Sequence, residues 1–246
     1  MPLVSVIVPY HQKKKYFKST LKSILTQTFQ DYEIIIVYND KNYDDLDYIK
    51  TLIKKNKKIL LLIKKKNLGA GMARNLGIKN SKGKFIAFLD SDDLWKKNKL
   101  EKQIMFMKKN KFEISHTAYE VKKDNKKKII KSKTFYNYSE LLKVCTIGLS
   151  TIIVKKKLFT QNKFSNLKTH EDFLLWLQIL KKGYKIHYLN RNLTTWRYTK
   201  NSLSSNYLQK VKDAFNVYYN FMKLNYLKSI YFLSILSFNS IKKKLI

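Results

Sequence analysis

The N-terminal part of the chain alternates between short apolar runs and segments of helical periodicity, and this alternation constrains the fold most strongly. The apolar runs are bounded by Pro, Gly or polar residues, as buried strands are, and cover residues 3–8, 34–37, 59–63 and 85–89. The predicted helices between them cover residues 16–28, 46–55 and 67–80. Such strand–helix units form right-handed crossovers, so we predict an α/β fold with a Rossmann-like, mainly parallel sheet and flanking helices.

Polar residues that are capable of binding or catalysis follow the predicted strands at the point where each strand ends. His11 follows the first strand, Asp40 follows the second, and Asp90 and Asp92 follow the fourth. The carboxyl ends of parallel strands meet at one edge of the sheet, and ligands bind outside that edge. The sequence therefore predicts a binding site built from these side chains.

The segment FIAFLDSDDLW, residues 85–95, ends a buried strand in three carboxylates, Asp90, Asp92 and Asp93. Carboxylates gathered at one point repel one another unless a cation lies among them. Mg²⁺ and Mn²⁺ prefer oxygen ligands and are often held by one or two carboxylates together with substrate phosphates. The alternative is a polar strand-to-helix turn in which Asp93 caps a helix beginning at Leu94.

The second half of the chain is less clearly patterned. We predict helices at residues 100–109, 139–144 and 171–182, and strands at residues 113–121, 150–155 and 185–189. Residues 122–133 are rich in Lys, and this composition predicts an exposed loop or hairpin.

The chain is strongly basic, with 51 Lys and Arg against 17 Asp and Glu and a net charge of +34 over 246 residues. Only Arg74, Arg191 and Arg197 are Arg, whereas proteins that read bases rely on Arg forks. The Lys residues are scattered along the whole chain, which is typical of a compositional bias. Such a surface attracts anionic lipid and nucleic acid, but no nucleic-acid recognition motif is present, so we expect no specific nucleic-acid partner.

One cysteine, Cys145, excludes an intramolecular disulfide and fits a reducing compartment. Three lysines, Lys13 to Lys15, interrupt the first apolar run where a signal peptide would continue. No stretch is apolar for long enough to predict a transmembrane span. We therefore expect a cytoplasmic location.

Five segments of the chain, in this order, resemble the family 2 glycosyltransferases, which are inverting, nucleotide-sugar-dependent enzymes of the GT-A fold. The segments are VSVIVPYHQ, SILTQTFQDYEIIIVYND, NLGAGMARNLGI, FIAFLDSDDLW and HEDFLLWL. Together they cover roughly residues 4–204. The resemblance implies a GT-A glycosyltransferase domain over residues 1–204, followed by a helical tail over residues 205–246.

The resemblance also implies which residues contact the nucleotide: Pro9, Tyr10, His11, Asn39, Asp40, Gly69, Arg74, Asn75, Asp90 and Ser91. Family members usually have Asn in place of His11 and Asp-Asp-Gly-Ser in the turn that here reads YNDKNYDD, residues 38–45. Asp40 is the expected reader of the base, with Asn39 as the alternative, because a carboxylate accepts a hydrogen bond from uracil N3–H. Gly69 and Gly71 are expected to allow close backbone approach, although a simple loop-to-helix junction would also explain them.

By the same resemblance, Asp92 and Asp90 form a DxD pair that holds a divalent metal, Mn²⁺ or Mg²⁺, with Asp92 as the direct ligand. The cation would neutralise the diphosphate leaving group. Arg197 is a further candidate for contact with the diphosphate. Thr199 stands near the position where family members often carry a phosphate- or metal-contacting His, so we expect no His ligand there.

The catalytic base implied by the resemblance is a carboxylate at the head of the predicted helix 171–182. Asp172 is the first choice and Glu171 the second, and His170 could orient this acid or touch the acceptor. Acidic residues at a helix N-terminus also complement the helix dipole, which is an alternative reason for their presence.

The tail is aromatic near Phe215 and Tyr218, and largely apolar over residues 229–241 before Lys242 to Lys244. A short apolar stretch flanked by Lys fits a helix lying on an anionic membrane surface. The alternative is a helical hairpin packed on the catalytic domain or on another subunit.

Taken together, we expect a membrane-associated inverting glycosyltransferase on the inner face of the cytoplasmic membrane. It would move a sugar from a nucleotide-sugar donor, UDP-linked by preference, to a glycan or lipid-linked acceptor of a surface polysaccharide or lipopolysaccharide. Two alternatives are a degenerate member that binds nucleotide without turnover and a basic nucleic-acid-binding protein.

Overall fold

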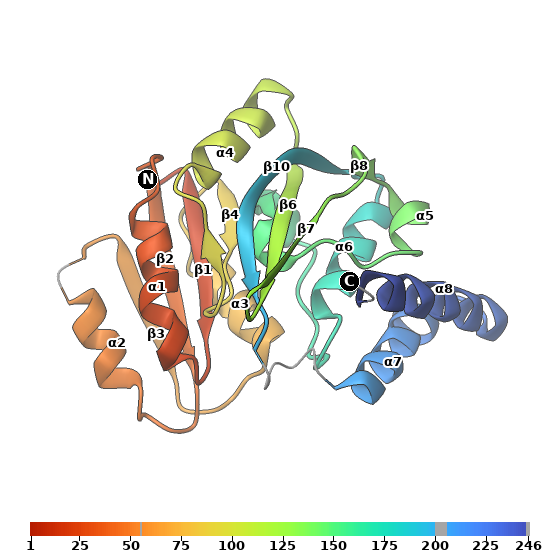
Figure 1. The fold of residues 1–246 in the computed structure, drawn as a ribbon, viewed down its shortest axis with the longest axis horizontal. Helices are drawn as coiled ribbons and strands as arrows, with labels where there is room; N and C mark the ends of the chain where they lie inside the picture. Colours follow the sequence, from red (N-terminus) through yellow and green to blue (C-terminus); the bar gives the residue numbers. More distant parts are fainter. Residues whose placement is uncertain (55, 200–205, 245–246) are drawn as a thin grey trace.

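The computed structural model describes residues 1–54, 56–199 and 206–244, and Figure 1 shows their arrangement around one mixed sheet. The N-terminal half of the sheet is parallel, in the order β3-β2-β1-β4. Its strands are β1 (Val4–Tyr10), β2 (Tyr32–Asn39), β3 (Ile59–Lys64) and β4 (Phe85–Phe88). Each is one of the predicted apolar runs, so the predicted α/β fold is confirmed.

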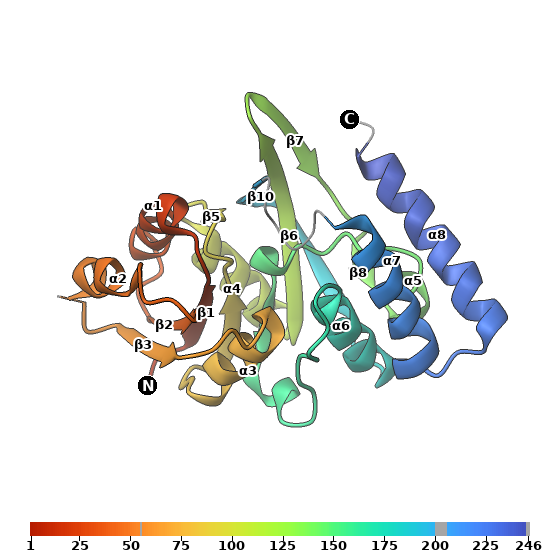
Figure 2. The same cartoon turned by 90° about the horizontal axis from the view of Figure 1, so that it is seen from below.

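Helices cover both faces of this parallel half. Helices α1 (Lys14–Leu25) and α2 (Leu46–Ile53) lie on one face and α3 (Ala70–Lys79) on the other (Figures 1 and 2). Alternate residues of β1 explain why both faces are apolar: Val4, Val6 and Val8 pack into the core beneath α1 and α2, and Ile7 packs into the core beneath α3. Both cores consist of buried apolar side chains that hold the strands in place.

The C-terminal half of the sheet is mixed. Strand β9 (Ile153–Lys155) runs antiparallel to β4 and to β6 (Ile114–Lys123), and β10 (Ile186–Arg197) runs parallel to β6. In the Lys-rich segment, β6 and β7 (Lys126–Ile130) form an antiparallel hairpin. The short strands β5 (Leu94–Trp95) and β8 (Phe135–Tyr136) pair with β10.

One expectation and one alternative for this half were wrong. The strand predicted at residues 185–189 continues to Arg197, because the polar residues after Leu189 form a bulge and pairing with β6 resumes at Asn192. No helix begins at Leu94, because residues 94–95 form β5, and helix α4 begins at Lys99 (Lys99–Lys109). Asp93 is therefore a buried residue of a turn and not a helix cap.

The C-terminal helices pack against α6 (Glu171–Lys181) at one end of the molecule (Figure 2). They are α7 (Tyr207–Asn216), a π-helical turn (Val217–Phe221) and α8 (Tyr226–Lys244), and the short α5 (Tyr138–Leu141) lies beside them. Val217, Tyr218 and Leu236 share one hydrophobic core with α6. The expected boundary between residues 204 and 205 lies outside the described residues. Within the described part of the chain, no helix is both long and apolar enough to span a membrane.

Candidate active site

The loops after β1 and β2 meet at the carboxyl edge of the sheet, as the sequence predicts. His11 Nδ1 lies 3.5 Å from Asp40 Oδ2, and Gln12 Nε2 donates to Asp40 Oδ1 at 3.5 Å. The side chain of Asp40 is 7 % exposed and that of His11 is 44 % exposed, so His11 covers the carboxylate from the solvent side. This leaves a shielded acceptor group at the end of β2.

Asn39, the alternative to Asp40, is occupied by the loop before α3. Its Oδ1 accepts a hydrogen bond from Leu68 N at 2.7 Å, and its Nδ2 donates to Gly69 O at 3.3 Å. The amide thereby fixes the loop to the end of β2. Of the two residues, Asp40 is the one whose side chain faces His11 and Gln12 and not the loop.

The two glycines of the NLGAG segment have different structural roles. Gly69 has φ = +79° directly before α3, a conformation that L side chains rarely adopt, and a Cβ atom there would meet nothing within 4 Å. A Cβ atom at Gly71 would clash with the carbonyl oxygen of Ser165. The close approach at Gly71 is therefore made by the chain's own backbone.

Arg74 joins two acidic groups that are far apart in the sequence. Its Nη2 lies 2.8 Å from Asp90 Oδ1 at the end of β4, and its Nη1 lies 2.6 Å from Glu171 Oε1 at the head of α6. The guanidinium is buried and stacks over the ring of Phe164. The two carboxylates hold the pKa of Arg74 above its usual range against the effect of burial, so the group is charged. Arg74 therefore fixes α6 relative to the DxD segment.

The head of α6 presents two carboxylates with different partners. Glu171 is buried and bound to Arg74, whereas the half-buried Asp172 accepts a hydrogen bond at Oδ1 from Phe173 N at 2.7 Å. Burial raises the pKa of both carboxyls, and the nearby charge of Arg74 opposes that rise. A carboxylate with a raised pKa is a better proton acceptor, and Asp172 is the one not tied to Arg74 by a hydrogen bond.

The turn before α6 is held by the C-terminal helices. His170 has a left-handed backbone (φ = 61°), and burial, with the charge of Lys210, lowers its pKa to about 4. Thr169 donates to Asp213 Oδ2 of α7 twice, from its backbone N at 2.9 Å and from its hydroxyl at 2.8 Å. His170 is therefore neutral at pH 7, and the turn is anchored from the tail.

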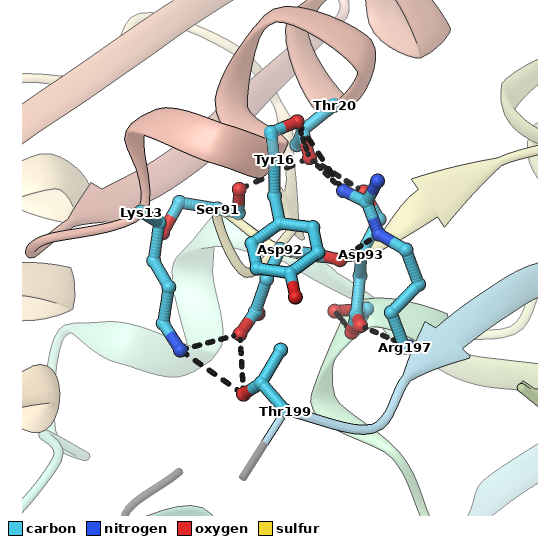
Figure 3. Close-up of polar contacts among 9 residues, drawn as sticks. Lys13, Tyr16, Thr20, Ser91, Asp92, Asp93, Arg197 and Thr199 are labelled. Carbon is cyan, nitrogen blue, oxygen red and sulfur yellow. Dashed lines mark hydrogen bonds and ion pairs between the residues drawn. The ribbon is translucent and has the colours of Figure 1, made fainter. Parts of the chain in front are cut away.

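Asp92 points towards a lysine (Figure 3). Lys13 Nζ lies 2.9 Å from Asp92 Oδ2 and donates to Thr199 Oγ1 at 3.1 Å, and Thr199 Oγ1 lies 3.4 Å from the same carboxylate oxygen. Among the described residues, no three His, Cys, Asp or Glu side chains gather as a metal site. Asp92 and Asp90 are the kind of ligand that a metal takes when it completes its shell with phosphate oxygens, although Lys13 pairs with Asp92 and Arg74 with Asp90 in this structure.

Comparison with known proteins identifies the family. The family model described as glycosyl transferase family 2 matches residues 5–168. The chain belongs to glycosyltransferase family 2. TuaG of Bacillus subtilis, named as a teichuronic acid biosynthesis glycosyltransferase, is 33% identical over 99% of this chain and 98% of its own length.

Two further similarities agree with this membership. The Escherichia coli enzyme WfgD, a UDP-Glc:α-D-GlcNAc-diphosphoundecaprenol β-1,3-glucosyltransferase, is 36% identical over 94% of this glycosyltransferase and 90% of WfgD. The crystal structure of Staphylococcus aureus TarS residues 1–349 with UDP-GlcNAc superposes with a TM-score of 0.74 at 19% identity, covering 100% of this chain and 76% of that one. The GT-A fold expected from the sequence is confirmed.

The remaining expected nucleotide-contacting residues of the glycosyltransferase lie around the same edge, and several have internal partners. Tyr10 donates to Asp45 Oδ2 at 2.6 Å, and the carbonyl of Ser91 accepts from Thr20 Oγ1 at 3.0 Å. Asn75 exchanges two hydrogen bonds with the backbone of Phe164, at 2.8 and 3.0 Å. Pro9 lies in β1, one residue before its end. The contacts of these residues with a nucleotide stay predictions.

Arg197 contacts the chain itself. Its guanidinium donates to Ser19 Oγ at 2.8 Å, to Thr20 Oγ1 at 2.7 Å and to the carbonyl of Asp92, and it lies over the ring of Tyr16 (Figure 3). It thus joins the end of β10 to α1 and to the DxD turn.

Sequence reasoning missed three supporting residues of the glycosyltransferase: Lys13, Ser150 and Asp213. Ser150 donates to Asp93 Oδ2 at 2.6 Å, and Arg197 N donates to Asp93 Oδ1 at 3.1 Å. Burial, together with the charges of Asp90 and Asp92, raises the pKa of Asp93 well above its usual range. The sequence signal for the buried contacts of Asp93 was its place as the third Asp of the cluster, where a helix cap was the alternative to a cation site.

Proposed function

We propose that this glycosyltransferase moves a sugar from a UDP-sugar to a glycan or lipid-linked acceptor with inversion at the anomeric carbon. The observation that carries the proposal is Arg74, which connects Asp90 at the donor edge with the head of the helix that presents Asp172. One buried cation thus holds the candidate donor site and the candidate base at a fixed separation. Such fixed positioning of two reactants lowers the entropic part of the activation barrier.

The proposed donor contacts follow from the carboxyl edge. Asp40 accepts a hydrogen bond from the N3–H of uracil, since Asn39 is occupied by Leu68 and Gly69. The open backbone at Gly69 leaves room for the nucleotide beside the start of α3. Phosphate groups bind well at such a position because unpaired backbone N–H groups point outward there.

In the proposed reaction, Asp172 accepts the proton of the acceptor hydroxyl. The hydroxyl oxygen then forms a bond to the anomeric carbon as the bond between that carbon and the diphosphate oxygen breaks. The electron pair of that bond leaves with the UDP. Glu171 keeps Arg74 in place, and the charge of Arg74 opposes the rise in the pKa of Asp172 and so favours its carboxylate form.

The proposed metal site consists of Asp92, with Asp90 beside it. A divalent cation, when bound, neutralises the charge that develops on the diphosphate. Lys13 Nζ lies 2.9 Å from Asp92 Oδ2, so its ammonium competes with the metal for that oxygen. It is also a second positive charge near the phosphates.

We further propose that the enzyme works at an anionic membrane surface, where a lipid-linked acceptor is found. Helix α8 exposes one apolar face, formed by Leu227, Ile230, Tyr231 and Phe238 at helical spacing. Lys223 and Lys228 are exposed near its start, and the sequence continues with Lys242 to Lys244. Apolar side chains between lysines are typical of helices that lie in the interface of an anionic bilayer. The lipid-linked acceptor in the name of WfgD supports the same location.

The test is a transfer assay with UDP-glucose, UDP-GlcNAc and GDP-mannose on a synthetic GlcNAc-diphospholipid. We expect transfer from a UDP-sugar and a β-linked product by NMR, because the donors are α-linked. An α-linked product would contradict inversion. Transfer from GDP-mannose alone would keep the reaction class but contradict the proposed role of Asp40.

A further inference from the structure

A groove with a volume of about 1080 Å³ runs along one flank of α3, and neither the DxD carboxylates nor the carboxylates at the head of α6 line it. Its floor is apolar and is formed by Leu68, Met72, Leu76, Ile78, Phe85 and Phe159. Arg74 is absent from its lining, since Arg74 points to the other flank of α3, towards Asp90 and Glu171. Of the residues expected to contact the nucleotide, Asn75 alone lines the groove, and its amide is bonded to the backbone of Phe164.

The rim of the groove is dominated by lysine. Nine of its nineteen lining residues are Lys and none is Asp or Glu. Lys makes up about one residue in five of the whole chain, so a random sample of nineteen would hold about four. The compositional bias of the chain therefore does not by itself explain this rim.

Most of these ammonium groups are not neutralised by the protein. Lys155 and Lys157 pair with Glu113, and Lys156 donates to the carbonyl of Ser81. The other six make no ion pair or side-chain hydrogen bond with any residue that the structure describes; they are Lys64, Lys66, Lys79, Lys82, Lys84 and Lys163. Six unneutralised cations around one groove create a positive potential that attracts an anionic ligand.

The positions of these lysines indicate the shape of the ligand. Lys64 and Lys66 precede α3, whereas Lys79 ends it and Lys82 and Lys84 follow it. A helix of this length measures about 15 Å, so the charges lie at both ends of the groove. A lipid carries its charge at one end only, whereas a polymer of acidic sugars carries charge along its length.

We propose that this groove binds an anionic polysaccharide with a carboxylate or phosphate on its successive sugars. The apolar faces of the sugar rings would lie on Met72, Leu76 and their neighbours, and the acidic groups would pair with the lysines of the rim. The polymer that the enzyme extends is the natural candidate for this ligand, and that part alone rests on the proposed function. Binding itself does not depend on turnover.

The test measures binding of a fluorescently labelled decagalacturonate, which has one carboxylate on each sugar, by anisotropy. The variant Lys79→Gln/Lys82→Gln/Lys84→Gln removes three charges from the end of the groove farthest from Gly69. The matched control, Lys102→Gln/Lys108→Gln/Lys109→Gln, removes three exposed charges from α4. We expect about tenfold weaker binding in the groove variant and less than about twofold in the control, with both effects smaller at high salt.

Met72→Ser tests the apolar floor, since Met72 is 42 % exposed and its replacement leaves the core intact. We expect weaker binding of decagalacturonate and unchanged weak binding of inorganic phosphate. Equal losses in the groove and control variants, or no loss in either, would overturn the proposal, because diffuse surface charge would then explain binding. Tighter binding of single-stranded DNA or of phosphatidylglycerol vesicles, lost in the groove variant, would assign the groove to those ligands instead. UDP titration of the same variants shows separately whether the donor site is intact.

Discussion

At the scale of single residues, Arg74 is the centre of the site. It is a buried cation between Asp90 and Glu171, and the charge of Asp172 also acts on it. A buried ion pair is a weak source of net stability, but removal of one partner leaves the other charges uncompensated. The main value of Arg74 is therefore the relative position of the DxD segment and α6.

Arg74→Met should lower the free energy of unfolding by about 3 kcal/mol, since two carboxylates then lie near each other without their cation. Urea denaturation at pH 7 measures the change. Arg74→Lys keeps the charge but not the two-pronged geometry, so it should recover part of the stability and little of the turnover. Unchanged stability in Arg74→Met would contradict the bridging role.

The pH dependence of turnover should report on Asp172. Burial raises the pKa of this carboxyl in the folded enzyme, and Arg74 opposes that rise. Turnover needs the carboxylate, so kcat should fall as the pH decreases through the raised pKa, above the range of an ordinary Asp. In Arg74→Lys the acid limb of the pH profile should move to higher pH, because the Lys ammonium lies farther from Asp172 and opposes the rise in its pKa less. An acid limb at an unchanged pH would show that the charge of Arg74 does not affect the pKa of the titrating group.

Lys13 gives a prediction for the metal. Lys13→Gln removes the ammonium that pairs with Asp92, so Mn²⁺ should bind about fivefold more tightly in calorimetry without nucleotide. Lys18→Gln removes an exposed charge of α1 and serves as the control. Weaker Mn²⁺ binding in Lys13→Gln would show that Lys13 does not compete for Asp92.

At the scale of elements, α7 anchors the turn that leads into α6. Asp213 accepts two hydrogen bonds from Thr169 and a third at Oδ1 from Gln209 Nε2 at 2.9 Å. Thr169 is three residues before Asp172, so the tail supports the turn that leads to the candidate base. The family match ends at residue 168, directly before this turn.

Asp213→Ala should reduce kcat about tenfold and leave the KM for the donor unchanged, because only the base loses its support. It should also cost about 2 kcal/mol of stability, since the donors of Thr169 lose a buried acceptor. Gln209→Ala leaves both contacts to Thr169 in place and should have little effect on kcat. A parallel loss of donor affinity would indicate general unfolding instead.

The elements also show what the sequence could and could not predict. The strands β1 to β4 and their edge were predictable because each is a continuous apolar run that ends in polar residues. The contact between Lys13 and Asp92 was not, since it joins segments 79 positions apart and a Lys-rich chain offers many candidates. The extension of β10 was missed because the polar residues around Arg191 interrupt its pattern at the bulge.

At the scale of the whole molecule, the proposed membrane association rests on the charge of +34 and on the exposed apolar face of α8. Leu227→Ser/Ile230→Ser/Phe238→Ser should abolish co-sedimentation with phosphatidylglycerol vesicles at moderate salt and leave UDP binding unchanged. The control Ser234→Ala lies on the same exposed face and should retain binding. Vesicle binding that survives in the triple variant would assign membrane attachment to diffuse charge alone.

The proposed mechanism assigns Asp172 as the base of an inverting transfer at the carboxyl edge. The most direct measurement compares wild type and Asp172→Asn in UDP affinity and in single-turnover transfer to the lipid-linked acceptor. The proposed mechanism predicts equal UDP affinity and a loss of turnover of at least about a hundredfold, because general-base catalysis contributes on that order. Turnover within a few fold of wild type, in a variant that binds UDP normally, would contradict the assignment and direct attention to Glu171.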